Sequence, residues 1–303
     1  MKKTIAIITS DPLSVNYEII KKSIFFFKKN NKNKYLFIGS KKLFNKKINT
    51  KKKYFQIENI IWNGHGKKKE YLQNSFNKFF ELYKKKKVHG LINLPLNKKK
   101  FFGSTYPGVT EYIAKKFNRS NLETMLLYNS NFSVSPLTTH CEIKNISKKI
   151  SIKKILVNFD NIYTFYKKFL KVKKPSIGIL GLNPHNSMDF KGVSEEEEII
   201  IPAIKKIRKK YRTKIYGPIS PDVSFIERES KNLNSLIGIY HDQVLTTFKY
   251  IHKFNAINIT LGLPFIRISP DHGTASNIIN KNKANPQSFI CCLEFFENFY
   301  KSI

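Results

Sequence analysis

Short apolar runs alternate along this chain with longer segments in which apolar residues recur every three or four positions. The short runs are typical of buried strands and the longer segments of amphipathic helices, so the alternation predicts α/β layering. The predicted strands are Thr4–Thr9, Tyr35–Ile38, Val88–Asn93, Glu123–Leu127, Phe132–Leu137, Ser176–Leu180, Leu236–Tyr240 and Ala256–Leu261. The predicted helices are Tyr17–Lys29, Glu70–Lys86, Thr110–Phe117, Ile152–Leu170, Glu195–Tyr211 and Pro286–Tyr300.

The length of 303 residues is enough for two packed units of ordinary domain size. No Pro/Gly/Ser-rich linker divides the sequence into two halves. If there are two domains, we therefore expect the chain to cross between them more than once. An active site would then lie in the cleft between the domains, where such sites tend to form.

The formal net charge of +34 would ordinarily suggest a nucleic acid or an anionic membrane as partner. The positive charge is almost all lysine, however, whereas phosphate and base recognition usually draws on the planar fork of arginine. The chain is also rich in Asn, Ile, Phe and Tyr, which share A/T-rich codons with Lys. A mutational bias explains all of these residues together, so we expect no nucleic-acid partner despite the basic charge.

Cysteine content and hydropathy favour a cytoplasmic protein. Cys141, Cys291 and Cys292 have no spacing that suggests a disulfide framework or a thiolate metal site. The apolar runs are too short to cross a bilayer, and the first residues lack the pattern of a signal peptide. We therefore expect a soluble protein without a membrane partner.

Three of the seven histidines, His140, His185 and His241, each follow a predicted strand. In α/β proteins functional residues concentrate just beyond the carboxyl ends of strands, and three imidazoles there could bind one metal ion. Asp242 could orient the neighbouring imidazole or bind the metal itself. For each histidine alone, a hydrogen-bonded loop role is the simpler interpretation, and the spacing matches no compact metal motif.

Two further groups of residues suggest anion binding. Lys249 and Arg267 bring positive charge to the same end of the predicted sheet as His241, where a substrate phosphate or carboxylate would explain them. Arg267 is the more informative of the two because arginine is scarce in this chain. The segment Asp271-His272-Gly273-Thr274-Ala275 leads into a predicted helical region and would allow close approach of an anion or a nucleotide.

Together these segments resemble the 4-hydroxythreonine-4-phosphate dehydrogenase family of pyridoxal phosphate biosynthesis. The resemblance covers the whole length, is strong from about Thr138 onward and is loose before it. The matching segments are Thr138–His140, Gly181–His185, Tyr240–Gln243, Asn258–Arg267 and Asp271–Ala275.

The resemblance implies oxidation of 4-phosphohydroxy-L-threonine by NAD or NADP, followed by decarboxylation to 3-amino-2-oxopropyl phosphate. It implies a homodimer with the active site at the interface, and a divalent zinc, magnesium or cobalt ion held by His140, His185 and His241. The other implied site residues are Thr110, Lys249, Asn258 and Arg267 for substrate, Lys249 and Asp242 for catalysis, and His272, Gly273, Thr274, Ala275 and Asn285 for cofactor.

The implied fold has two α/β/α domains around a central cleft, as in the isocitrate and isopropylmalate dehydrogenases. Residues 1–125 together with 255–303 would form the first domain, and residues 126–254 the second. The absence of a Gly-x-Gly-x-x-Gly fingerprint after any predicted strand agrees with this fold rather than with a Rossmann domain.

Two departures from the family pattern lie in the N-terminal half. The loop from Thr9 to Tyr17 lacks the glycines of the family, and Val109 stands where the family has a substrate-binding histidine. Two alternatives to the family reaction therefore stay open. One is a sibling dehydrogenase for another phosphorylated hydroxy acid, such as an erythronate phosphate. The other is a degraded enzyme kept as a basic binding protein.

Overall fold

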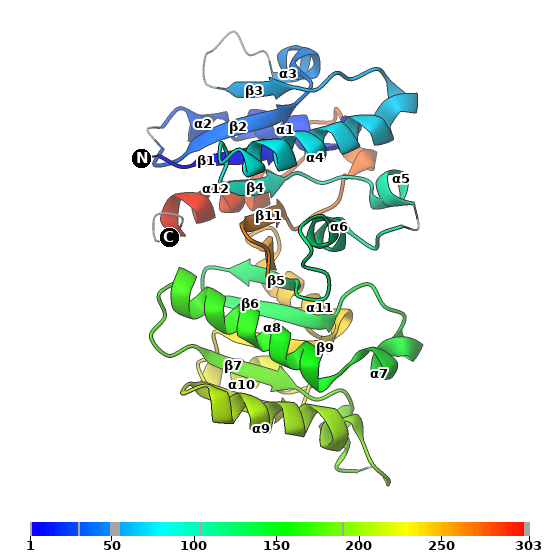
Figure 1. Ribbon diagram of the computed structural model, residues 1–303, viewed down its shortest axis with the longest axis vertical. Coiled ribbons are helices and arrows are strands. Elements are labelled where there is room, and N and C mark those ends of the chain that lie inside the picture. The colour runs from blue at the N-terminus through cyan, green and yellow to red at the C-terminus, as the bar shows by residue number, and fades with distance from the viewer. Residues whose placement is uncertain (1, 30, 49–54, 104, 190, 300–303) are drawn as a thin grey trace. The chain divides into compact units, whose positions relative to one another are not determined.

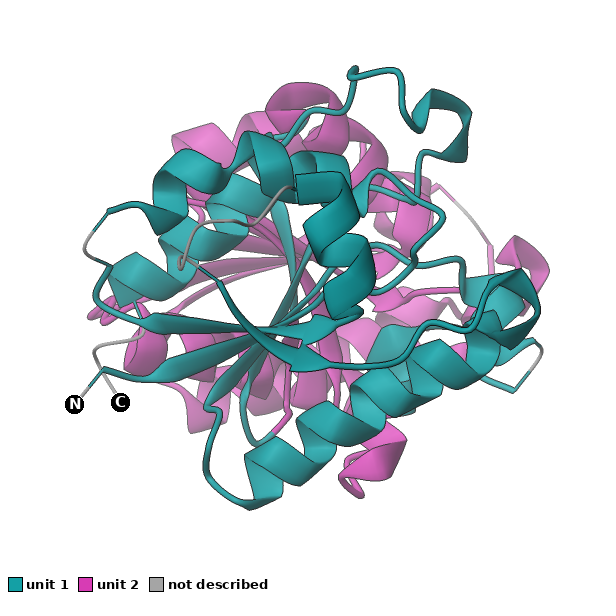
Figure 2. Cartoon of the chain, turned by 90° about the horizontal axis from the view of Figure 1, so that it is seen from above, with its two compact units in different colours: residues 1–112, 254–259, 264–303 teal, residues 113–253, 260–263 magenta. Residues whose placement is uncertain are grey.

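The computed structural model describes residues 2–29, 31–48, 55–103, 105–189 and 191–299, and they form two compact units. Unit 1 contains residues 1–112, 254–259 and 264–303, and unit 2 contains residues 113–253 and 260–263 (Figure 2). Residues 113–125, placed in the first domain on sequence grounds, belong to unit 2. Asn161 of that unit ties them there, because its side-chain amide donates to Leu122 O at 2.7 Å and to Thr124 Oγ1 at 3.0 Å. No helix among the described residues is long and apolar enough to cross a membrane.

Unit 1 is built on a parallel sheet with the strand order β3-β2-β1-β4-β11 (Figure 1). Helices pack on its strands, and Figure 2 shows them on both sides of the sheet. The strands are β1 (Thr4–Ile8), β2 (Lys34–Gly39), β3 (Gln56–Asn59), β4 (Gly90–Asn93) and β11 (Ile266–Pro270). The helices are α1 (Asn16–Lys22), α2 (Ile24–Phe27), α3 (Lys41–Ile48), α4 (Lys68–Lys84), α5 (Lys98–Phe102) and α12 (Gln287–Phe299).

The core of unit 1 combines aliphatic residues with many aromatic rings. On α4 the fully buried residues Leu72, Phe76 and Phe79 recur at helical spacing and form the apolar face. On the other elements, the rings of Phe37 and Phe44 meet edge to face with 5.0 Å between their centroids. Each buried phenylalanine contributes about 1.5–3 kcal/mol from the removal of apolar surface from water.

Polar contacts hold the glycine-free loop that follows β1. The Asn16 side-chain amide donates to Thr9 O at 2.9 Å and to Pro95 O at 2.8 Å, which joins the two ends of the loop to the residues after β4. The buried carboxylate of Asp11 forms an ion pair with Lys68 and accepts hydrogen bonds from Leu13 N at 2.9 Å and Asn97 N at 3.3 Å. The loop is therefore fixed by side-chain contacts, although it contains no glycine.

Unit 2 has the strand order β5-β6-β9-β7-β8, in which β5 is antiparallel to β6 and the other pairs are parallel. Figure 1 shows α8 in front of this sheet and α11 behind it. The strands are β5 (Thr124–Asn129), β6 (Phe132–Thr138), β7 (Ser176–Leu180), β8 (Lys214–Ile219) and β9 (Ser235–Tyr240). The helices are α7 (Ile146–Lys149), α8 (Ile152–Thr164), α9 (Ile201–Lys210), α10 (Ser224–Ser230) and α11 (His241–His252). The residues of α6 (Val109–Lys116) and β10 (Ile257–Leu261) are divided between the two units.

The predicted α/β class is confirmed, and each of the eight predicted strands overlaps an observed one. The sequence prediction missed β3, β8 and β11 and the helices α3, α5, α7, α10 and α11. β8 contains Pro218, which lacks a backbone donor and is tolerated because this strand is at the sheet edge. α11 was missed because Thr246 and Thr247 lower helix propensity and no side chain caps its start. The predicted end of the last helix, Tyr300, lies outside the described residues.

Asparagine occupies many backbone positions with left-handed geometry. Among the described residues, φ lies between 51° and 64° at six asparagines: 118, 121, 186, 232, 280 and 282. Apart from glycine, asparagine is the residue that enters this region most readily, since its short side chain can hydrogen-bond to the local backbone. The chain therefore makes many of its tight turns without glycine.

Replacing Lys68 with Met should leave the buried carboxylate of Asp11 without its ion-pair partner. We expect the free energy of unfolding to fall by about 3 kcal/mol, the usual cost of breaking a buried pair from one side. Urea denaturation of the full chain measures this. Lys69→Met is the matched control, because Lys69 is the exposed neighbour on the same helix. Equal denaturation midpoints for the two variants would show that the pair does not stabilise the loop.

Candidate active site

The three predicted metal-binding histidines follow neighbouring parallel strands of unit 2. β9 pairs with β6 on one side and with β7 on the other, and all three strands run in the same direction. His140 comes two residues after β6, His241 directly after β9, and His185 five residues after β7. Their backbones therefore leave the sheet at the same edge, as expected for functional residues of an α/β protein.

His140 and His241 lie side by side. Their ring centroids are 6.1 Å apart and the planes of the rings are inclined at 38°. Asp242 lies next to His241 Nδ1, with 2.9 Å between that nitrogen and Oδ1. A carboxylate on Nδ1 favours the tautomer in which Nε2 carries a free lone pair, which is the arrangement commonly found for histidines that bind metals.

His185 is held apart from this pair. It has a φ of 47°, its side chain is 60% exposed, and its Nδ1 lies 2.6 Å from Asp189 Oδ2. The hydrogen bond to this carboxylate, followed by its negative charge, raises the pKa of His185. Across the part of the chain that the structure describes, no three His, Cys, Asp or Glu side chains form a group able to bind a metal ion. One copy of the chain therefore brings two of the three predicted ligands together.

A buried carboxylate, Glu196, fixes the loop that carries His185. It accepts hydrogen bonds from Leu182 N at 2.7 Å, Asn183 N at 2.8 Å and Ser187 Oγ at 2.6 Å. Burial alone would raise the pKa of Glu196, but the hydrogen bonds from Asn183 and Ser187 outweigh it and lower the pKa. Sequence reasoning did not select Glu196, because a run of four glutamates at 195–198 gave no sign of which one is buried.

Gln243 connects the same loop to β9. Its side-chain amide donates to Gly181 O at 2.8 Å, and its side-chain oxygen accepts from Ile239 N at 2.6 Å. The loop that carries His185 and the start of the helix that carries His241 are therefore joined through one side chain.

In unit 1, Arg267 is the centre of a buried polar cluster. Its side chain is on β11, paired with Leu91 of β4, and the residue is 3% exposed. Nε donates to Asn93 Oδ1 at 2.6 Å, and one terminal nitrogen lies 3.5 Å from Thr110 Oγ1. Burial lowers the pKa of Arg267 to about 10, while the nearby carboxylate of Glu111 opposes this shift. The guanidinium thus stays charged at neutral pH.

The remaining predicted substrate residues have contrasting surroundings. The side-chain oxygen of Asn258 on β10 is buried and accepts no hydrogen bond from the described residues, as expected of a group that awaits a ligand. Val109 is buried at the start of α6. Lys249 is exposed on α11, two turns after His241.

The predicted cofactor segment lies against the loop after β1. Thr274 O accepts a hydrogen bond from Val15 N at 3.2 Å, and Ala275 has a left-handed backbone with φ of 46°. A side chain added at Gly273 would meet no atom within 4 Å, so the backbone there is open to a neighbouring molecule. Asn285 has a structural role as well, because its side chain accepts from Gln287 N at 2.8 Å at the start of α12.

Glu196→Gln should loosen the loop that carries His185. We expect a loss of about 2 kcal/mol in the free energy of unfolding at pH 7, since hydrogen bonds to a charged group contribute about 1.5–3 kcal/mol. Because the pKa of Glu196 is lowered on folding from its ordinary 4.5, its contribution is present above that pH and is lost as the pH falls through the folded value. The difference between wild type and variant should therefore shrink in acid. Urea denaturation between pH 7 and pH 3 tests this, and the exposed neighbour Glu197→Gln should show neither effect.

Comparison with known proteins places these features in one family. The family model described as pyridoxal phosphate biosynthetic protein PdxA matches residues 9–295. The 4-hydroxythreonine-4-phosphate dehydrogenase of Sulfurihydrogenibium sp. is 38% identical over 226 residues, which are 74% of this chain and 68% of that protein. The enzyme of the same name from Aquifex aeolicus is 38% identical over 220 residues, covering 71% and 67%.

Solved structures share the fold over nearly the full length. A structure from Salmonella typhimurium has a TM-score of 0.81 at 25% identity and covers 98% of this chain and 99% of that one. The 4-hydroxythreonine-4-phosphate dehydrogenase of Klebsiella pneumoniae has a TM-score of 0.79 at 24% identity, with 97% and 98% covered, and this likeness concerns the fold alone. By its family match and its relatives, the chain belongs to the PdxA family of pyridoxal phosphate biosynthetic proteins.

Proposed function

We propose that this chain oxidises 4-phosphohydroxy-L-threonine with NAD or NADP, and that the 3-oxo acid formed loses carbon dioxide to give 3-amino-2-oxopropyl phosphate. This reaction is a step in pyridoxine 5′-phosphate biosynthesis. The family match across residues 9–295 carries the proposal, since it includes all of the predicted site residues. The relatives named for this activity favour it over a sibling dehydrogenase or a degraded binding protein.

Arg267 and its neighbours supply the part of the site that binds an anion. The guanidinium is buried and positively charged, and Asn93 fixes its orientation through Nε. A phosphate or carboxylate of the substrate would be attracted to this charge and could form a charge-assisted hydrogen bond with it. Thr110, beside the guanidinium, and Asn258, with its unpartnered oxygen, supply further polar groups of unit 1. These residues would bind and orient the substrate before reaction.

His140 and His241 suit a divalent metal as two of its ligands. Their rings are adjacent, and Asp242 orients His241 so that Nε2 is available. A bound zinc, magnesium or cobalt ion would supply Lewis acidity that eases deprotonation of the substrate hydroxyl as hydride leaves to the nicotinamide. Lys249, on the same helix as His241, would exchange a proton with the substrate.

The third ligand, His185, would come from a second copy of the chain. Its loop is fixed by Glu196 and Gln243, so it does not simply swing toward the other two histidines. Ile143 follows His140 by three residues and is 78% exposed, and Met188 follows His185 by three residues and is 79% exposed. Large apolar side chains exposed on both histidine segments suit burial against a partner. We therefore infer a homodimer whose metal site takes ligands from both subunits.

The proposed reaction is tested by reduction of NAD or NADP in the presence of 4-phosphohydroxy-L-threonine. We expect turnover that is lost with a chelator and restored by added zinc, magnesium or cobalt, because the ion supports removal of the hydroxyl proton. An erythronate phosphate should be a poor substrate. No turnover with any of these metals would rule out the proposed function.

Mixing of two inactive variants tests the shared metal site. His185→Ala and His241→Ala should each abolish metal-dependent turnover as homodimers. In a mixed dimer, one of the two sites takes His140 and His241 from the first variant and His185 from the second, so that site is complete. Random reassortment of equal amounts should therefore restore about a quarter of wild-type activity, since half of the dimers are mixed and each has one intact site.

The same mixture distinguishes the alternative in which each chain holds its own metal. Both sites of every mixed dimer would then lack one histidine, and activity would stay absent. A mixture of His140→Ala with His241→Ala is the matched control, because these two ligands belong to the same copy and no reassorted site is complete.

A further inference from the structure

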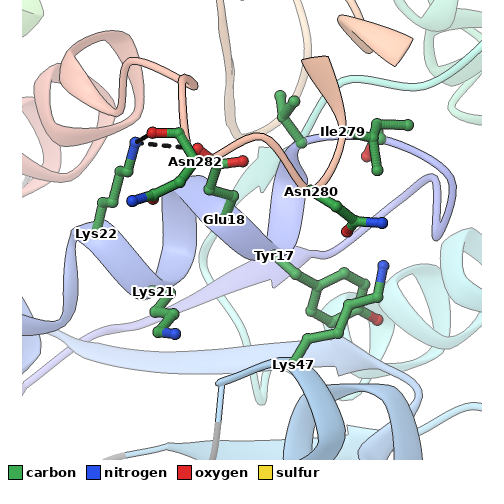
Figure 3. A pocket seen from close by; sticks show the side chains of 10 residues that line it. Tyr17, Glu18, Lys21, Lys22, Lys47, Ile279, Asn280 and Asn282 are labelled. Carbon is green, nitrogen blue, oxygen red and sulfur yellow. Dashed lines mark hydrogen bonds and ion pairs between the residues drawn. The ribbon is translucent and has the colours of Figure 1, made fainter. Parts of the chain in front are cut away.

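Unit 1 contains a pocket of about 550 Å³ between α1, the end of α3 and the segment 279–282 (Figure 3). Its lining includes Tyr17, Lys21, Lys22, Lys47, Asn280 and Asn282. Pockets of roughly 300–1,000 Å³ are typical of small-molecule and cofactor sites, so an adenosine group would fit. The functional residues described above do not line this pocket.

Lys22 and Glu18 form part of the wall of this pocket. Their side chains contact each other and the backbone of the segment that precedes α12. Lys22 Nζ donates to Asn282 O at 2.9 Å and Ala284 O at 2.8 Å, and it lies 3.0 Å from Glu18 Oε1. The same carboxylate oxygen accepts from Ala284 N at 2.7 Å. Figure 3 shows Lys22 turned toward Asn282. These contacts fasten the segment that precedes α12 onto α1, and they leave the only acidic side chain of the lining already engaged.

The uncompensated charge in the pocket is positive. Lys47 is half-buried, with Nζ 5.3 Å from the centroid of the Tyr17 ring and 3.4 Å from Pro12 O. Burial, and then the neighbouring charge of Lys46, lower the pKa of Lys47, so an anion beside it would relieve an unfavourable environment. Lys21 is exposed at the rim and forms no hydrogen bond or ion pair with any residue that the structure describes.

The pocket lies next to the segments predicted to contact the cofactor. Val15 lines it and donates to Thr274 O, and the lining residues Ile279, Asn280 and Asn282 stand in the chain between Ala275 and Asn285. We propose that this pocket receives the phosphate on the adenosine 2′-oxygen of NADP, and that Lys47 and Lys21 make the chain prefer NADP to NAD. This inference rests on the proposed function in taking a nicotinamide dinucleotide as the oxidant.

The donors in the pocket decide between the two cofactors. NAD presents a ribose hydroxyl at this position and NADP presents a phosphate. Rossmann dehydrogenases bind the hydroxyl with a carboxylate and the phosphate with a cationic side chain, and the same complementarity of charge applies to a site of another fold. The negative charge of Glu18 is already paired with Lys22, and its Oε1 also accepts from Ala284 N, which makes Glu18 a poor choice for that carboxylate. Neither Lys47 nor Lys21 forms an ion pair with a residue that the structure describes, and their ammonium groups only donate hydrogen bonds, so they complement a phosphate and not a hydroxyl.

Isothermal titration of the full-length protein with adenosine 2′,5′-bisphosphate and with adenosine 5′-monophosphate tests this inference. An ionic strength of about 0.15 M screens the diffuse attraction of a chain with this net charge. We expect the wild type to bind the bisphosphate about tenfold or more tightly than the monophosphate, and Lys47→Met and Lys21→Met each to reduce that ratio to about threefold or less. Lys46→Met is the matched control, because Lys46 is exposed, adjacent in sequence and outside the lining, and the ratio should not change.

Equal affinity of the wild type for the two nucleotides would overturn the inference. So would a Lys46→Met variant whose ratio of the two affinities falls as far as that of Lys47→Met. The titration needs no turnover, so it separates this inference from the proposed function. Preference for the bisphosphate without oxidation of 4-phosphohydroxy-L-threonine would refute the function alone. Oxidation with equal use of NAD and NADP, together with equal binding of the nucleotides, would refute the role of the pocket alone.

Discussion

The parallel pairing of β9 with β6 and β7 determines where unit 2 can carry chemistry. Parallel strands end at the same edge, so side chains that follow them meet there whatever their distance in sequence. His140 and His241 meet because each leaves its strand within two residues of its end. His185 leaves β7 by a longer path, and its position depends on the loop and not on the sheet.

Buried charges then fix the loops at which the strands end. Glu196 binds the backbone of the loop after β7, and Asp11 binds the backbone of the loop after β1 and that of Asn97. Arg267 joins β11 to β4 through Asn93. A buried charge that lacks partners is costly, so each of these groups strongly favours the one backbone arrangement that satisfies it. The loops that carry the candidate site residues are thus held by buried charges, as a site of fixed geometry would require.

The strands and the positions of the histidines could be predicted from the sequence because both depend on local apolar pattern. The separation of His185 from the other two could not, since it follows from left-handed turns at residues 185–187 and from the burial of one glutamate among four. The contacts that fix the glycine-free loop between Thr9 and Tyr17 could not be predicted either. Those of Asn16 and Asp11 reach residues more than 50 positions away, which no local pattern reveals. Arg267 was predicted by its rarity, but its partner Asn93 lies 174 residues away in sequence.

The asparagines in left-handed turns explain how such a biased composition remains compatible with this fold. Glycine codons are rich in G, so a drift toward A and T removes glycine, and a β-branched or bulky replacement at positive φ would strain the turn. Asparagine is encoded by A/T-rich codons and tolerates that geometry, as at Asn280 and Asn282 beside the pocket. It also restricts the unfolded chain more than glycine does, which offsets part of the strain. Turn geometry thus limits which mutations are tolerated: among the described residues, asparagine is the most frequent residue other than glycine at these positions, followed by lysine, and both have A/T-rich codons.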